Sequence, residues 1–182
     1  MIEAPTEHRY QFSALRGDYI RSAAGLVLTG LPLLVAGGAL IPSLILGALA
    51  ATFCVFGIRT WLRQSSTVRI GPEAIRLHRF SHSDPGKTIA WDAVDTVKLA
   101  YYSTRRDKAQ GWMNLKIRGD GSVIIVDSMI DGFDDVSLVA AKAAVDRGLM
   151  LNDTTVRNFA ALGIIIDCID GRAVGARKDS IL

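Results

Sequence analysis

The sequence has no charged side chain between Ser22 and Ile58, a run of 37 residues. A helix needs about 20 residues to cross the hydrocarbon core of a bilayer, so this run is long enough for two crossings. Glycine and proline gather in its middle, in the segment 36–43, where they favour a reversal of the chain. The sequence therefore predicts a tight hairpin of two membrane-spanning helices, at about 20–37 and 42–61.

The predicted spans also lack ionisable residues, which excludes a proton relay or a charged conduction path built from their side chains. Arginine instead lies on both flanks, and the cytoplasmic flanks of bacterial spans are enriched in Lys and Arg. The flanking arginines are Arg9, Arg16, Arg21, Arg59, Arg63 and Arg69. A cleaved signal peptide is the alternative, but the acidic residues before the first span and the second apolar run argue against it. We therefore expect an integral protein of the bacterial inner membrane with both termini in the cytoplasm.

Cysteine is scarce, and its placement indicates neither a disulfide framework nor a metal site. Cys54 and Cys168 are the two cysteines of the chain, and they lie far apart without the spacing of metal ligands. His78, His82 and Asp84 offer imidazole and carboxylate groups that suit several divalent ions. Their positions at the end of a strand and in a Pro-Gly loop fit surface residues better. We therefore expect no bound metal.

Sequence motifs of catalysis are missing as well. The chain has no nucleophile elbow, no P-loop and no Gly-rich dinucleotide fingerprint. Its basic residues are not interleaved with a platform of stacking aromatics, so nucleic-acid binding is not predicted. We expect a protein that is not an enzyme and that holds no cofactor.

After the predicted hairpin, the hydrophobic pattern alternates with a period of two, which is typical of strands with one buried face. Asp120 and Gly121 form a strong hairpin-turn signal between two of these strands. The strand after the turn is apolar on both faces, so we expect another element to cover its second side. The predicted strands are 67–70, 75–78, 87–91, 95–102, 113–118 and 122–126, with Trp91 and Leu115 in the core.

Two helices are predicted next. The first has Asp134 or Asp135 as its N-cap, contacts the sheet through residues such as Val139, and ends at Gly148. The second is shorter, begins at Asn152 or Asp153 and ends at Gly163. The tail 164–182 mixes a short apolar run with a basic stretch. We assign it no structure and expect disorder in its last ten residues.

Short antiparallel strands followed by one amphipathic helix are typical of a pleckstrin-homology (PH) barrel, in which a helix closes one end of a curved sheet. The stretches 89–97 and 111–115, and the helix with its trailing Gly148-Leu149, resemble the PH-like domains of small bacterial membrane proteins with two N-terminal spans. The resemblance implies a membrane α-helical hairpin plus an α+β PH-like domain, with an antiparallel curved sheet or partly open barrel capped by a helix. It implies no common activity. The expected organisation is a cytoplasmic segment at 1–19, the hairpin at 20–61, the PH-like domain at 65–163 and the tail at 164–182.

Charge is distributed unevenly along the part that follows the spans. Residues 59–118 contain 12 Lys and Arg against 5 Asp and Glu, a net charge of +7, whereas residues 119–182 have a net charge of −4. Anionic lipids attract juxtamembrane cations, and a solvated basic face is the alternative. The candidate surface for an anionic lipid or a protein partner comprises Arg69, Arg76, Lys87, Arg105, Arg106, Lys108 and Trp112.

The resemblance also locates the loop in which phosphoinositide-binding PH domains hold their ligand, between the first two strands. Several converging cations are needed there to hold several phosphates. The matching loop is expected at Gly71–Ala74, which is short and carries Glu73. A specific headgroup site in this loop is therefore not favoured.

Two kinds of function remain open. The protein is either a binding module that recognises a protein segment or anionic lipid through an exposed sheet edge or loop, or a structural subunit docked into a larger membrane assembly through its hairpin. The small residues Gly25, Thr29, Gly47 and Ala51, and also Ala50 with Cys54, form strips that allow close helix packing, within the hairpin or against another protein.

Overall fold

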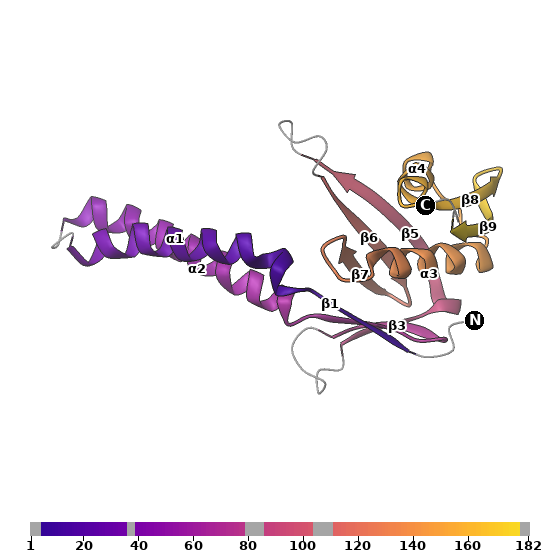
Figure 1. Ribbon diagram of the computed structural model, residues 1–182, viewed down its shortest axis with the longest axis horizontal. Helices are drawn as coiled ribbons and strands as arrows, with labels where there is room; N and C mark the ends of the chain where they lie inside the picture. The colour runs from indigo at the N-terminus through magenta and orange to yellow at the C-terminus, as the bar shows by residue number, and fades with distance from the viewer. Residues whose placement is uncertain (1–4, 36–38, 79–85, 104–110, 179–182) are drawn as a thin grey trace. The chain divides into compact units, whose positions relative to one another are not determined.

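The computed structural model describes residues 5–35, 39–78, 86–103 and 111–178. The chain divides into two compact units. The helical unit is Tyr10–Ser66, and the sheet unit combines residues 1–9 with residues 67–182. The sheet unit is thus built from two separate stretches of sequence, and the helical unit is inserted between them (Figure 1).

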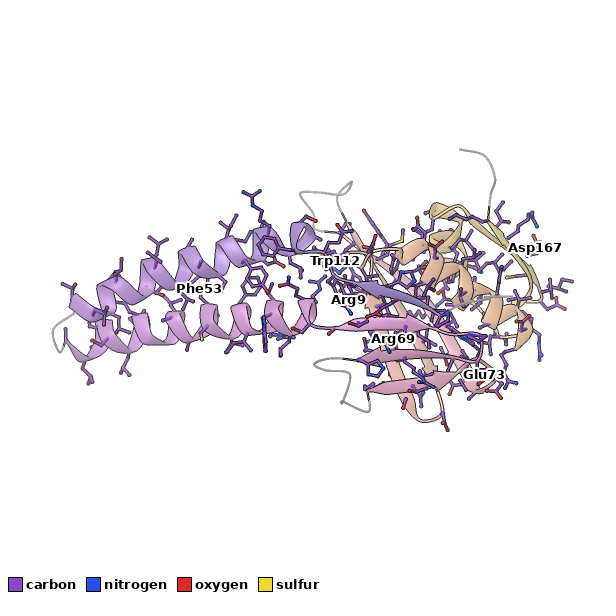
Figure 2. All side chains as sticks on the ribbon, turned by 60° about the horizontal axis from the view of Figure 1, so that its bottom comes forward. Arg9, Phe53, Arg69, Glu73, Trp112 and Asp167 are labelled. Atoms are coloured by element: carbon purple, nitrogen blue, oxygen red, sulfur yellow. The ribbon has the colours of Figure 1, made fainter. Side chains whose placement is uncertain are left out.

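The helical unit consists of α1 (Phe12–Val35) and α2 (Leu40–Gln64), which lie side by side. Both are long and apolar enough to cross a membrane. Their large apolar side chains face outward; Leu34, for example, is 83% exposed. Small and polar residues take part in the contact between the helices. Ser22 donates a hydrogen bond to the Phe53 carbonyl oxygen at 3.0 Å, and Gly25 lies against the Phe53 ring. The Phe53 side chain is labelled in Figure 2.

The helices extend beyond the spans expected from the apolar run. α1 begins at Phe12, ahead of the expected start near residue 20, because the segment before the run also contacts α2. Leu15 is fully buried, and the Tyr19 hydroxyl donates to Gln64 Oε1 at 2.6 Å. Of the expected small-residue strips, Gly25 and Thr29 lie in the contact. Ala51 and Cys54, in contrast, are exposed.

The first sheet has the order β1-β2-β3-β4, and all its neighbours are antiparallel. Its strands are β1 (Thr6–Arg9), β2 (Thr67–Ile70), β3 (Ala74–His78) and β4 (Lys87–Ala90). β1 was not predicted: the segment 1–19, which we expected to stand apart from the sheet, supplies its edge strand. Arg9 pairs with Thr67, so the two connections to the helical unit leave from neighbouring positions of one ladder.

The second sheet has the order β5-β6-β7 and follows a short 3-10 turn, η1 (Trp91–Ala93). Its strands are β5 (Val94–Tyr102), β6 (Trp112–Gly119) and β7 (Ser122–Asp127). The predicted hairpin turn joins β6 to β7, and both turn residues have positive φ, 51° at Asp120 and 68° at Gly121. These angles are those of a type I′ turn.

Two expectations about the packing of this region were wrong. β7 is apolar on both faces, yet its outer residue Ile125 is 54% exposed, because no described element covers that side. Trp91 lies in η1 rather than in a strand and is only half-buried; its indole nitrogen donates to the Gly71 carbonyl oxygen at 2.9 Å. The core is formed by the inner faces of both sheets. Its fully buried strand residues include Val68, Ile75, Ile89, Leu99, Leu115, Ile117 and Ile124.

Both predicted helices are present, as α3 (Phe133–Asp146) and α4 (Asp153–Ala161). α4 begins as predicted, with the Asn152 side chain accepting from the Thr155 backbone N–H at 2.7 Å. α3 does not use an aspartate cap. Its N-cap is Gly132, whose φ of 66° and close approach to the buried His8 ring leave no room for a side chain. Val136 is buried in the core, whereas the expected contact residue Val139 is half-buried.

The tail is ordered rather than unstructured through residue 178. β8 (Ile164–Ile169) and β9 (Arg172–Lys178) form an antiparallel hairpin that contacts α3 and α4. Ile164 and Ala173 are buried, and the Ala173 backbone N–H donates to the Leu149 carbonyl oxygen at 3.0 Å. The hairpin therefore belongs to the packed core of the sheet unit.

Candidate functional site

Two arginines of the expected surface lie directly opposite each other on the outer face of the first sheet. The strand register pairs Glu7 with Arg69, Arg69 with Arg76, and Arg76 with Thr88, so these four residues form one row across β1 to β4. Because side chains alternate between the two faces of a sheet, the residues on either side of the row, such as Val68 and Ile75, point into the core. The row is accordingly the exposed side of a rigid, well-packed sheet.

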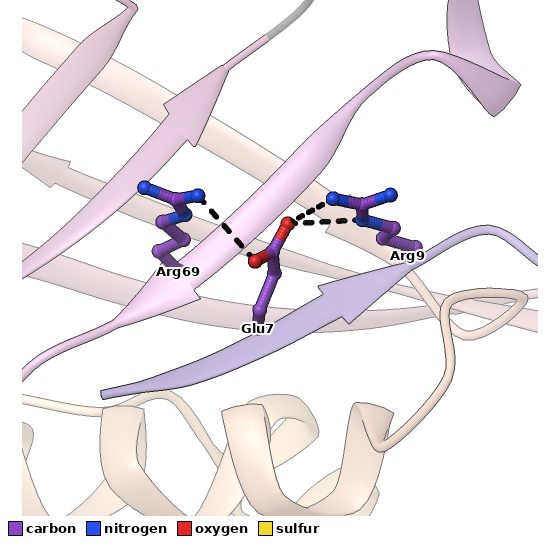
Figure 3. A network of polar contacts seen from close by, with 3 residues as sticks. All are labelled: Glu7, Arg9 and Arg69. Atoms are coloured by element: carbon purple, nitrogen blue, oxygen red, sulfur yellow. Dashed lines mark hydrogen bonds and ion pairs between the residues drawn. The ribbon is translucent and has the colours of Figure 1, made fainter. Parts of the chain in front are cut away.

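Glu7 joins this row to a third arginine (Figure 3). Its Oε1 accepts from Arg9 Nε at 2.9 Å and from Arg9 Nη2 at 2.6 Å, while its Oε2 lies 3.4 Å from Arg69 Nη2. Like charges directly opposite each other in a sheet are unfavourable, so the single carboxylate offsets part of the repulsion. We call Arg9, Arg69 and Arg76 the arginine row. With Glu7 included, the cluster has three positive charges and one negative charge.

Lys87 is not part of this cluster, contrary to the expectation that it would join Arg69 and Arg76. It pairs with the buried Leu77, so its side chain starts from the opposite face of the sheet. Its Nζ donates to the Val123 carbonyl oxygen at 3.1 Å, between β4 and β7. Lys87 therefore links the two sheets. The other expected cations, Arg105, Arg106 and Lys108, lie outside the described residues.

Trp112 lies on a different surface, the outer face of the second sheet. Its ring stacks on that of Tyr102, with centroids 5.9 Å apart and an interplanar angle of 23°. The two side chains are 43% and 48% exposed. Among the candidate residues that the structure describes, Arg69 and Arg76 thus lie on the outer face of the first sheet and Trp112 lies on that of the second.

The outer face of the second sheet carries further cations that were not singled out from the sequence. Lys98 and Lys116 lie directly opposite each other, and Lys116 also pairs with the exposed Ile125. Arg118 lies two register positions further, on the same face, with its Nε 3.9 Å from a carboxylate oxygen of Asp95. The alternation of β5 and β6 placed these cations on the outer face, but only the register brings them together.

Two of the sheet edges considered for strand addition carry contacts from within the chain. Asn158 of α4 donates to the Leu99 carbonyl oxygen at 2.8 Å, at the edge of β5. At the edge of β1, the Arg9 carbonyl oxygen accepts from the Asp131 backbone N–H at 3.1 Å. Backbone groups that already have a partner are poor templates for a new strand. These contacts favour the faces of the sheets over their edges as interaction surfaces.

The loop expected to match the headgroup loop of PH domains has a different place in the fold. Gly71–Ala74 joins β2 to β3, because β1 precedes the helical unit. The connection between the first two strands of the sheet is the helical unit itself. The expectation that Gly71–Ala74 lies between the first two strands was therefore wrong, because it counted the strand at 67–70 as the first.

No group of three His, Cys, Asp or Glu side chains that could hold a metal occurs among the described residues. Cys54 and Cys168 are free and exposed. Comparison of the chain with protein-family models, with curated proteins and with solved structures found no match.

Proposed function

We propose that this protein is a non-catalytic, membrane-anchored PH-like module at the cytoplasmic face of the bacterial inner membrane, and that its arginine row binds anionic lipid headgroups. The observation that carries the proposal is the pairing of Arg69 with Arg76 on an exposed sheet face, beside Arg9 on the same face. The strands that supply Arg9 and Arg69 continue directly into the apolar helices.

Membrane insertion is supported by the way in which the helical unit exposes its side chains. A soluble protein rarely exposes a contiguous apolar patch of more than a few hundred Å², whereas both helices carry large apolar residues around most of their outer surface. The pairing of β1 with β2 supports an even number of crossings, because both ends of the helical unit must lie on the same side of the bilayer. The flanking arginines favour the cytoplasmic side.

The PH-like assignment is supported by the arrangement of the sheet unit. Four antiparallel strands are followed by three, their inner faces share one core, and α3 packs beside β5. Gly119 of β6 approaches Ile89 of β4 so closely that a side chain would not fit between the sheets. These contacts support a curved, partly open barrel with a helix against it.

Chain length limits how far two of these arginines can lie from the ends of the helices. Arg9 precedes the first residue of α1 by three positions, and Arg69 follows the last residue of α2 by five. An extended chain spans at most about 3.6 Å per residue, so the Cα atom of each lies within roughly 18 Å of a helix end. A cation that reaches an anionic surface contributes about 1 kcal/mol. Two arginines in contact with the surface would therefore shift the equilibrium between a lipid-bound and a free sheet face by roughly 30-fold.

The test uses the full-length protein reconstituted in nanodiscs. After Cys54→Ala and Cys168→Ala, a fluorophore is attached at Thr88→Cys, beside Arg76, or at Ile125→Cys, on the other sheet. A quencher on the lipid headgroups should quench the label at position 88 more strongly when anionic lipid is present. Salt should weaken this effect, since such interactions are screened over about 8–10 Å at physiological ionic strength.

Substitution of the arginines provides the decisive comparison. Arg69→Gln with Arg76→Gln should abolish the dependence on anionic lipid, whereas Lys142→Gln with Arg157→Gln, which removes two exposed cations from α3 and α4, should retain it. If the label at position 88 ignores anionic lipid at low salt, the lipid-binding proposal fails.

The alternative function, an accessory subunit of a larger membrane assembly, is supported by one observation. Ala51 and Cys54 are small residues on α2 that the contact with α1 does not use, and small residues allow another helix to approach closely. Purification in mild detergent would then recover a stoichiometric membrane partner. Ala51→Leu should release that partner without unfolding the chain.

A further inference from the structure

The outer face of the second sheet combines exposed apolar side chains with lysines. Tyr102, Trp112 and Ile125 are each more than 40% exposed. Lys98 and Lys116 face each other, and neither makes an ion pair with another described residue. We call these five residues the aromatic-basic face. Two carboxylates border it: Asp95, which lies beside Arg118, and Asp127, which accepts from the Met129 backbone N–H.

The size of this face matches a single helix. Three strands spaced about 4.8 Å apart present a width of about 10 Å, and an α-helix with its side chains is about 10–12 Å across. From Lys98 to Tyr102 the face extends about 13 Å along β5, which equals about nine helical residues. Because Asn158 occupies the β5 edge at Leu99, a partner lying across the face is favoured over a strand added at this edge.

The position of the face separates it from the lipid surface described above. The two sheets pack on each other through their inner faces, so their outer faces point in different directions. One flat membrane cannot lie against both. This step rests on the proposed function. If the arginine row lies against lipid, the aromatic-basic face does not lie against the same membrane surface.

We propose that the aromatic-basic face binds an acidic amphipathic helix of a protein partner. The apolar stripe of that helix packs on Trp112, Tyr102 and Ile125, and Asp or Glu on its flanks pair with Lys98 and Lys116. Charge complementarity selects an acidic helix, because the lysines are directly opposed and make no ion pair with another residue that the structure describes. Trp and Tyr are enriched among the residues that dominate binding at protein interfaces.

The probe is a fluorescent peptide of about 18 residues, long enough to form a helix in isolation, with leucine in an i, i+3, i+4, i+7 stripe and glutamate on both flanks. Its anisotropy is measured with the full-length protein in nanodiscs of neutral lipid, which removes any contribution of anionic headgroups. We expect saturable binding that weakens as salt rises. A peptide with the same residues in scrambled order, and one with lysine in place of glutamate, should bind at least about tenfold more weakly.

Variants then locate the site. Lys98→Glu with Lys116→Glu, and separately Trp112→Ala, should each weaken binding about tenfold or more. Lys142→Glu with Arg157→Glu makes the same change of charge at exposed positions on α3 and α4, and should leave binding unchanged. Melting temperatures of all variants show whether a loss of binding comes from unfolding.

Several outcomes contradict the proposal. Absence of binding of the acidic peptide at low salt would overturn it. The same would follow if Lys142→Glu with Arg157→Glu weakened binding as much as Lys98→Glu with Lys116→Glu. Quenching of a label at Ile125→Cys by anionic lipid would assign the face to the membrane instead. The peptide assay contains no anionic lipid and does not rely on the arginine row, so it can fail while the lipid-binding proposal stands, and the reverse also holds.

Discussion

At the scale of single residues, Glu7 has the most direct influence on the proposed lipid site. Its carboxylate contacts two of the three arginines, at 2.6 Å to Arg9 and at 3.4 Å to Arg69. An exposed ion pair contributes about 0.2–1 kcal/mol. Lipid phosphates can therefore displace the Glu7 carboxylate from the arginines, but they must compete with it.

Glu7→Gln should therefore strengthen the lipid-dependent quenching at position 88. The change removes the competing negative charge and leaves a neutral side chain of similar size, so we expect a gain of a few fold in apparent affinity for anionic lipid. Titration of the anionic lipid fraction measures it. Glu73→Gln, at an exposed turn of the same sheet, is the matched control and should have little effect. A loss of binding in Glu7→Gln would mean that the carboxylate organises the arginines and does not compete with lipid.

Core residues provide the second prediction at this scale. Leu115 is fully buried, whereas Trp91 and Val139 are only half-buried. Leu115→Ala should lower the unfolding free energy of the sheet unit by about 2–5 kcal/mol, and Val139→Ala should lower it by clearly less. Thermal unfolding followed by near-UV circular dichroism compares the two. A larger effect from Val139→Ala would contradict the core described here.

At the scale of elements, the packing of α1 against α2 depends on where small residues lie. A side chain at Gly25 would overlap the Phe53 ring, whereas Gly30 has open space around it. Alanine in place of glycine stabilises a helix interior by about 0.5–1 kcal/mol. Gly30→Ala should therefore raise the stability of the helical unit slightly, and Gly25→Ala should lower it, because the ring must move. The temperature of thermal aggregation in detergent compares the variants. Equal shifts of this temperature in Gly25→Ala and Gly30→Ala would argue against the packing of Gly25 on Phe53.

The sequence predicted most elements but missed those whose partners are distant or polar. Hydrophobic length identified both membrane-length helices, helical spacing of apolar residues identified α3, and the Asn152 cap identified α4. β1 has one buried residue, His8, in four, and its partner strand begins at Thr67, so no local periodicity distinguishes it. In β9 the single fully buried residue is Ala173. Short strands with one buried position give no reliable alternation signal.

The candidate site was predicted less well than the fold, for a related reason. Sequence reasoning named Arg69, Arg76 and Lys87 as neighbours, but a change of one residue in register moves a side chain to the opposite face of a sheet. Lys87 is opposite a buried leucine and lies apart from the other two. Arg9 and Glu7 were missed because their strand was not predicted. The charge composition indicated a basic region. Only the strand register determined which charged side chains are neighbours.

At the scale of the whole molecule, the insertion of the helical unit makes a soluble version of the sheet unit possible. Arg9 and Thr67 are paired neighbours in an antiparallel ladder, and a short loop that contains glycine can join two strands at such a pair. Replacing residues 10–66 by a short glycine-containing loop should give a soluble, folded domain. A fragment that starts at Thr67 lacks β1 and leaves the edge of β2 open, so it should aggregate.

Size-exclusion chromatography and the dispersion of amide NMR signals distinguish the two proteins. If both proteins were soluble and folded, β1 would contribute little to the stability of the sheet unit. Residues 1–9 would then not be an essential part of that unit.

The split of the first sheet around the helical unit also determines the order of events during synthesis. β1 leaves the ribosome first, yet its partner β2 is made only after both helices, which takes roughly three to eleven seconds at about 5–20 residues per second. In the membrane-anchored arrangement proposed above, the strand stays unpaired during this interval on the side of the bilayer where β2 will emerge. If either helix then failed to insert, or the N-terminus were carried across, β1 and β2 would end on opposite sides of the bilayer and the sheet would stay open. Completion of the sheet would thus depend on correct insertion, and a misinserted chain would expose an unpaired edge that proteases can recognise.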